Sequence, residues 1–236
     1  MRASVTMKQP NSTQLHRQCL PAIAVLTAFV LTASAQTNAH CANTPSLADE
    51  VAAVESTGKN PTSNVTLPQI VKRTMAFHFG TPSYCEQSIE EFTKTLHVDK
   101  RINRPAGVFV TLTKNGKTRG CWGSVYPQYD SVAKATVYAT MGALSKEYRF
   151  APITAHEWQK LRPQVTVIRR VEPISSISEQ DPLSDGLLVR SGGKSGVLLP
   201  GEATDAYYQM VQCKLKAGIK SGESCQLYKL KVEIYD

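Results

Sequence analysis

The chain has 236 residues, of which 42% are hydrophobic and 19% are charged, a composition typical of globular proteins that excludes a disordered or low-complexity chain. The formal net charge is +8, but the Lys and Arg residues are scattered and aromatic residues do not interleave with them. The sequence therefore does not indicate a nucleic-acid-binding protein.

Residues 1–35 have the pattern of a secretion signal. Arg17 precedes an apolar run over residues 20–31, and Ala33-Ser34-Ala35 offers small residues to a signal peptidase. The run is shorter than the roughly 20 apolar residues that span a bilayer, so we expect cleavage after Ala35 rather than a membrane anchor. We expect an exported protein, periplasmic or secreted, with no stable membrane span after cleavage.

Residues 36–65 are poor in large apolar side chains and rich in Asn, Thr, Ser and Ala, so we expect a flexible lead-in before a domain at 66–236. Within that domain, Thr66-Leu67-Pro68-Gln69 has a capping-box pattern and predicts a helix that ends at Gly80. A similar pattern at Ser83-Tyr84-Cys85-Glu86 predicts a second helix that extends to about Leu96.

Residues 107–113 alternate and are rich in β-branched side chains, and the Asn115-Gly116 pair after them predicts a tight hairpin with a return strand to about residue 124. After this hairpin we expect a helix rich in small side chains over 130–143, then a strand over 164–169 that Pro173 stops. A polar connection over 174–183 leads to a second hairpin over 186–199. The chain then forms a helix capped by Thr204 and closed by Gly218, and a final strand over 226–234. Hairpins alternate with helices without βαβ repeats, which predicts an α+β fold with a largely antiparallel sheet flanked by helices.

The cysteines that remain after cleavage at Ala35 would meet an oxidising compartment. They are Cys41, Cys85, Cys121, Cys213 and Cys225. Their odd number implies at least one free thiol. We expect a disulfide between Cys213 and Cys225, with Cys85 bonded to either of these two as the alternative, and Cys121 as the free thiol.

The return strand contains Arg119-Gly120-Cys121-Trp122-Gly123, where a thiol, a fixed positive charge and a permissive backbone coincide. Glycines in a strand indicate a bulge or the close approach of a ligand or of another backbone. Because residues two apart in a strand share a face, we expect Arg119 and Cys121 to line one wall. Cys121 is then either a nucleophile or a small buried apolar side chain.

Arg149 is a second candidate for anion recognition beside Arg119, and its alternative is an ion pair with Glu147 or Asp130. A nucleophile needs a base, and His156 is the best placed candidate, although it also fits a solvated turn. The other histidines after residue 35 are His40, His78 and His97. No spacing of His, Cys, Asp or Glu indicates a metal site, and no motif indicates a cofactor.

The motif Arg119-Gly120-Cys121-Trp122-Gly123 resembles the Leu-Arg-Gly-Cys-Ile-Gly signature of the AMMECR-one domain family, with Thr118 and Trp122 at its two aliphatic positions. Further segments resemble the family's Arg-Phe-x-Pro element, late hairpin and C-terminal helix ending; they are 148–152, 186–189 with 196–200, and 213–219. The resemblance spans about residues 67–236 and implies the family's α+β fold. The family's biochemical activity is unsettled, so the resemblance implies no reaction.

Two functional hypotheses remain open. The first is an exported AMMECR-one domain protein that binds a small molecule or anion in a cleft formed by Arg119, Gly120, Gly123 and Arg149, with Cys121 as a catalytic thiol. The second is a non-catalytic protein-interaction module in which the same motif is structural. Trp122 would either enlarge the core or form one wall of the cleft.

Overall fold

The computed structural model describes residues 64–81, 83 and 85–236. The chain divides into two compact units, Met1–Thr44 and Pro45–Asp236, and the described residues belong to the second. The expected signal peptide, Cys41, His40 and nearly all of the expected lead-in lie outside the described residues.

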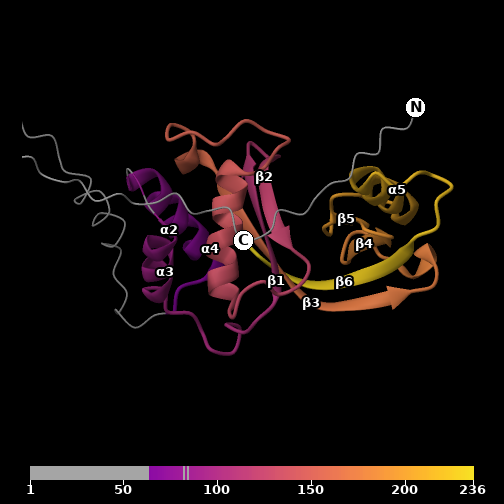
Figure 1. The fold of residues 1–236 in the computed structure, drawn as a ribbon, viewed down its shortest axis with the longest axis horizontal. Coiled ribbons are helices and arrows are strands. Elements are labelled where there is room, and N and C mark those ends of the chain that lie inside the picture. Colours follow the sequence, from indigo (N-terminus) through magenta and orange to yellow (C-terminus); the bar gives the residue numbers. More distant parts are fainter. Residues whose placement is uncertain (1–63, 82, 84) are drawn as a thin grey trace, which may run out of the picture. The chain divides into compact units, whose positions relative to one another are not determined.

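The fold is built on a six-stranded sheet with the order β2-β1-β3-β6-β4-β5, in which every neighbouring pair is antiparallel. The strands are β1 (Gly107–Lys114), β2 (Lys117–Ser124), β3 (Arg162–Ile174), β4 (Gly186–Ser191), β5 (Lys194–Leu198) and β6 (Gln226–Tyr235). Long strands β3 and β6 join the β1/β2 end of the sheet to the β4/β5 end (Figure 1).

Four helices among the described residues flank this sheet: α2 (Leu67–Gly80), α3 (Glu86–Lys94), α4 (Val132–Ser145) and α5 (Ala206–Ala217). Helices α2, α3 and α4 gather at the β1/β2 end, and α5 covers β4 and β5 (Figure 1). Short 3-10 turns occupy Trp158–Lys160 and Ile177–Glu179. The α+β fold with a largely antiparallel sheet is confirmed.

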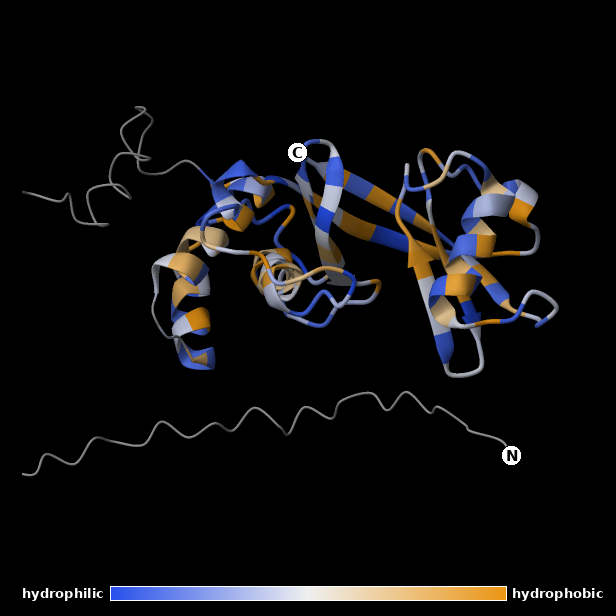
Figure 2. Cartoon of the chain, turned by 90° about the horizontal axis from the view of Figure 1, so that it is seen from above, coloured by the Kyte–Doolittle hydropathy of each residue, from blue (hydrophilic) through white to orange (hydrophobic). Residues whose placement is uncertain are grey.

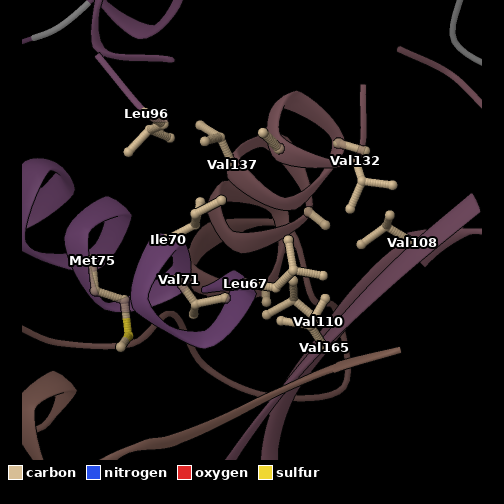
Figure 3. Close-up of a cluster of buried hydrophobic side chains, with 14 of the residues drawn as sticks. Leu67, Ile70, Val71, Met75, Leu96, Val108, Val110, Val132, Val137 and Val165 are labelled. Carbon is tan, nitrogen blue, oxygen red and sulfur yellow. The ribbon is translucent and has the colours of Figure 1, made fainter. Parts of the chain in front are cut away.

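Each end of the sheet has its own apolar core. At the β1/β2 end, Ile70 and Val71 of α2 and Val137 of α4 pack against strand residues such as Val110 (Figure 3). At the other end, α5 packs on β4 and β5 through a cluster that contains Leu187. Apolar and polar residues alternate along the strands that join the two ends (Figure 2), because successive side chains in a strand point to opposite faces.

Several local sequence signals form the structures that they predict. The capping box at Thr66 is complete: Gln69 N donates to Thr66 Oγ1 at 3.4 Å, and Thr66 N donates to Gln69 Oε1 at 2.9 Å. Asn115 and Gly116 have φ angles of 53° and 75°, the positive values that a two-residue hairpin turn requires. Gly218 closes α5 with a φ of 66°.

Two predicted helix starts are wrong. Helix α3 begins at Glu86 with Cys85 as its N-cap, so the second capping box does not form at Ser83. Helix α5 is capped by Asp205 rather than Thr204, because the Asp205 carboxylate accepts a hydrogen bond from Tyr208 N at 2.7 Å.

Strand β3 is longer than predicted and continues through Pro173 to Ile174. Its pairing with β1 ends at Ile168, so the last part of β3 has only β6 as a neighbour. On such a one-sided segment a proline can turn its missing N–H toward the open side without losing a ladder hydrogen bond. Pro173 therefore does not stop the strand.

The four described cysteines, Cys85, Cys121, Cys213 and Cys225, are free thiols. The expected disulfide between Cys213 and Cys225 is absent, and so is its alternative through Cys85. Cys213 is fully buried, and its thiol donates to the carbonyl of Leu187 at 3.4 Å. The packing of α5 on β4 thus decides where this sulfur points. No helix in the described part of the chain is long and apolar enough to cross a membrane.

Candidate functional site at strand β2

The arginine–cysteine motif lies on β2, which is an edge strand among the described strands and pairs there with β1 alone. Thr111 of β1 faces Cys121, and Leu112 faces Gly120, but the register shifts before Thr113, which faces Thr118. Arg119 is therefore the extra residue of a β-bulge. A bulge breaks the alternation of side chains, so the expectation that Arg119 and Cys121 line one wall does not follow from their spacing.

Arg119 clasps the hairpin to the segment that follows α4. Its guanidinium donates to Ala151 O at 2.8 Å, to Pro152 O at 3.3 Å and to Glu157 Oε1 at 2.6 Å. Lys114 Nζ donates to the other oxygen of Glu157 at 2.9 Å. Hydrogen bonds from Lys114 and then Arg119 lower the pKa of Glu157 to about 2. Both terminal nitrogens of Arg119 therefore donate to other groups of the protein.

The two glycines of the motif lie against other backbone segments. A Cβ atom at Gly120 would lie 2.6 Å from the carbonyl oxygen of Ala143 in α4. A Cβ atom at Gly123 would lie 2.1 Å from Val108 O and 2.6 Å from Phe109 Cα in β1. Both distances are too short for a side chain, so these glycines permit close helix–strand and strand–strand approach.

The Cys121 thiol is half-buried, and Thr111 Oγ1 donates to its sulfur at 3.4 Å. Burial raises the pKa of this thiol; the Thr111 hydrogen bond opposes the rise, and the charges of Glu202, Arg149 and Lys216 also act on the sulfur. Because burial dominates, the group is a neutral thiol at neutral pH. A neutral thiol is a weak nucleophile and serves better as a polar contact.

Arg149 pairs with Glu147, as one of its two alternatives predicted, and not with Asp130. The buried Glu147 carboxylate accepts from Arg149 Nε at 3.0 Å and from Nη2 at 2.7 Å. It also accepts the backbone N–H of Cys121. The hydrogen bond from Arg149 is the main cause that lowers the pKa of Glu147, and the one from Cys121 adds to it. Glu147 therefore holds Arg149 beside Cys121.

The charges of Glu202 and Lys216 act on the thiol from the β4/β5 end, and no sequence pattern indicated either residue. Lys216 Nζ lies 3.6 Å from Glu202 Oε2 and donates to Val197 O at 3.1 Å. Both side chains are about one-third exposed, at 36% and 34%. They lie more than 80 positions after Cys121 in the chain, so only the fold brings their charges to the thiol.

The profile of the AMMECR1 family, called AMMECR-one above, matches residues 82–236, which contain the whole sheet. The chain belongs to the AMMECR1 family. A Thermotoga maritima protein is 33% identical over 141 residues, 58% of this chain and 81% of the relative. A Methanocella arvoryzae protein is 31% identical over 168 residues, 63% of this chain and 84% of the relative.

The crystal structure of the uncharacterized protein PH0010 from Pyrococcus horikoshii has the same fold as this AMMECR1 protein. The two superpose with a TM-score of 0.61 and 25% sequence identity, over 71% of this chain and 88% of that chain. These comparisons establish the family and the fold of the chain.

The candidate base His156 is exposed in the turn before Glu157 of the AMMECR1 domain. His97 is also exposed, with its Nδ1 3.0 Å from Thr95 O, and burial lowers the pKa of His78. Within the described ranges, no three side chains of His, Cys, Asp or Glu gather in a way that could hold a metal ion.

Proposed function

We propose that this AMMECR1 protein binds a small molecule with an anionic group, such as a carboxylate or a phosphate, beside Cys121. One observation carries the proposal: the buried Glu147 carboxylate accepts the backbone N–H of Cys121 and holds the Arg149 guanidinium beside it, and the opposite charges of Glu202 and Lys216 also reach the half-buried thiol. Charges converging on a partly exposed polar group are typical of ligand sites.

Arg149 is the group best suited to contact the anion. Its Nε and Nη2 atoms are used by Glu147, but Nη1 makes no hydrogen bond to another described residue. The side chain is 36% exposed, so solvent reaches part of it. Glu147 fixes the guanidinium in place, which reduces the conformational entropy that the arginine loses when it binds a ligand.

Cys121 supports a binding role better than a catalytic one. A thiol enzyme needs a thiolate, and burial raises the pKa of Cys121 away from that state. As a neutral group held by Thr111, the thiol offers a weak donor and acceptor to a bound molecule. Covalent chemistry at this sulfur would need a ligand or partner that lowers its pKa.

The test is a thermal-unfolding titration with inorganic phosphate and, separately, with succinate at constant ionic strength. A ligand at ten times its dissociation constant raises the melting temperature of a domain of this size by about 3–6 °C. We expect at least one of the two anions to stabilise the wild-type protein. We expect Arg149→Gln to lose that response, and Cys121→Ser to weaken it.

Arg101→Gln is the matched control, because Arg101 also clamps the carboxylate two residues before it. Its Nε and Nη2 donate to Asp99 Oδ2 at 2.9 Å and 2.5 Å, but the side chain is 89% exposed and does not act on Cys121. Arg101→Gln should keep the full response. The proposal fails if neither anion stabilises the wild type, or if Arg149→Gln and Arg101→Gln respond alike.

A structural role for the motif, as in an interaction module, is the second candidate. It is favoured by the close packing at Gly120 and Gly123 and by the contacts of Arg119. On this view, Arg119→Ala lowers the melting temperature, and neither Arg149→Gln nor Cys121→Ser alters any anion response. Anion-dependent stabilisation that is lost in Arg149→Gln would contradict it.

We propose further that the protein is exported, on the strength of the apolar run over 20–31 and the small residues that end at Ala35. Expression of the full chain in a secreting host tests this. Mass spectrometry of the periplasmic or culture fraction should find a mature protein that begins at Gln36. Recovery of the uncut chain from the cytoplasm alone would refute export.

A further inference from the structure

A cavity of about 100 Å³ lies between β2 and α4, next to the motif but separate from the proposed anion site. Its aromatic lining comes from Trp122, Tyr129 and Tyr138, and the small side chains Ala135 and Ala139 of α4 leave the space open. Trp122 follows Cys121 directly in the strand and packs on α4, whereas the Cys121 thiol contacts Thr111. Successive strand residues point to opposite faces, so the two sites lie on opposite sides of β2.

Trp122 is held in place by the absence of a side chain on the helix. A Cβ atom at Gly142 of α4 would lie 2.1 Å from Trp122 Cδ1 and 2.4 Å from Cγ, so the indole rests against the helix backbone. The side chain is 37% exposed, and its N–H makes no hydrogen bond to the described residues. The indole is therefore positioned but still presents surface to a ligand.

The two tyrosines form a second fixed aromatic wall. The rings of Tyr129 and Tyr138 stack with their centroids 4.5 Å apart and their planes 14° apart. The Tyr138 hydroxyl donates to Glu90 Oε1 at 2.9 Å, which ties the ring to α3. Both rings are thus held in place without a ligand, so little entropy is lost on binding.

The surroundings of these rings carry more negative than positive charge. Burial raises the pKa of both tyrosine hydroxyls, and the carboxylates of Glu86 and Glu90 raise them further. Asp130 adds a third carboxylate, which acts on Lys134. Two cations oppose these three carboxylates: Lys134 pairs with Glu90 at 2.8 Å, and the charge of Lys94 also acts on Glu90. The local balance favours a positively charged ligand.

We propose that this cavity binds a small organic cation with a methylated ammonium group. The faces of tryptophan and tyrosine rings attract cations, with tryptophan the strongest, and aromatic cages of this kind bind quaternary ammonium groups. The cavity volume of about 100 Å³ is smaller than the roughly 150 Å³ that holds benzene, so the cavity admits at most one compact head group and the rest of the ligand stays outside it.

Choline and its uncharged isostere 3,3-dimethylbutan-1-ol make the test, because they share a shape and differ in one positive charge. Binding of each to the full chain is followed by NMR line broadening and by titration calorimetry. Since a cation–π contact is worth about 1 kcal/mol or more, choline should bind at least about fivefold more tightly than the alcohol.

Three variants locate the binding. Trp122→Leu, which restores an aliphatic residue, should abolish the preference for choline. Lys134→Gln removes the cation that pairs with Glu90 and should tighten choline binding about twofold or more while leaving the alcohol unchanged. Tyr148→Leu is the matched control, since Tyr148 is 85% exposed and does not line the cavity, and it should bind choline like the wild type.

A gain of affinity in Lys134→Gln cannot come from misfolding, so this variant keeps the proposal falsifiable if Trp122→Leu is unstable. Equal binding of choline and the alcohol would overturn the proposal, because the cavity would then recognise only shape. Absence of binding by either compound, or a Trp122→Leu protein that still prefers choline, would also overturn it.

Discussion

The contact between Trp122 and Gly142 predicts a substitution whose effect on stability changes sign with its partner. Replacing glycine by alanine inside a helix normally stabilises it by about 1 kcal/mol. Here the new methyl group would lie 2.1 Å from Trp122 Cδ1, and displacing a packed ring costs about 1–3 kcal/mol. Taking about 2 kcal/mol for the clash, Gly142→Ala should destabilise the protein by about 1 kcal/mol.

In a Trp122→Ala background the ring is gone, so Gly142→Ala should stabilise by the full helix term of about 1 kcal/mol. The coupling free energy between the two sites is then about 2 kcal/mol, within the range measured for residues in contact. Urea unfolding of the wild type, both single variants and the double variant closes the cycle.

Gly80→Ala in α2 is the control, because nothing lies within 4 Å of its added Cβ atom. It should show no coupling to Trp122→Ala. If Gly142→Ala changes stability by the same amount in both backgrounds, the indole does not rest on the helix at this glycine, and the aromatic wall of the cavity is also in doubt.

Three further outcomes are expected. Gly123→Ala should lower the free energy of unfolding, measured in urea, by about 3 kcal/mol, because its methyl group would meet the β1 backbone. Gly193→Ala is the control, since nothing lies within 4 Å of its added Cβ atom, and it should cost far less. Similar costs for the two variants would contradict the packing at Gly123. The pKa of Glu157 is lowered from 4.5 to about 2, so its contribution to stability is present above pH 4.5 and is lost as the pH falls toward 2. The difference in melting temperature between the wild type and Glu157→Gln should therefore shrink over that interval. A constant difference would contradict the lowered pKa. In thiol labelling at neutral pH, Cys85 should react in the folded protein, because a hydrogen bond with Ser88 lowers its pKa. Cys213 should react only in denaturant, because burial raises its pKa to about 12. Labelling of Cys213 in the folded protein would refute its burial.

Elements whose signals are local could be predicted from the sequence. The Thr66 capping box, the Asn115-Gly116 turn and the glycine that ends α5 each depend on residues a few positions apart, and each formed as predicted. The small side chains of α4 likewise indicated close packing against the sheet; a Cβ atom added at Gly120 would lie only 2.6 Å from Ala143 O, which confirms it.

The composition of the site depended on the position of a β-bulge, which the local sequence does not specify. Counting back from the Asn115-Gly116 turn would place Cys121 opposite Val110, but the bulge at Arg119 moves the pairing by one residue, to Thr111. Because of that shift, the Thr111 hydroxyl lies beside the Cys121 thiol, and the Arg119 side chain reaches the segment 151–157. The glycines of the strand indicated a bulge as one alternative, but neither its position at Arg119 nor its effect on the pairing followed from the strand alone.

By itself, the sequence determined the order of helices and strands, the α+β class and the membership in the AMMECR1 family, because periodicity, caps, turns and a signature motif are written in neighbouring residues. The tertiary structure alone decided which charges reach Cys121, since Arg149, Glu202 and Lys216 come from three separate segments. It also decided that Trp122 completes an aromatic cavity on α4. Both outcomes arise from packing between segments far apart in the sequence. At Gly142, for example, the lack of a side chain leaves the room that the Trp122 indole occupies.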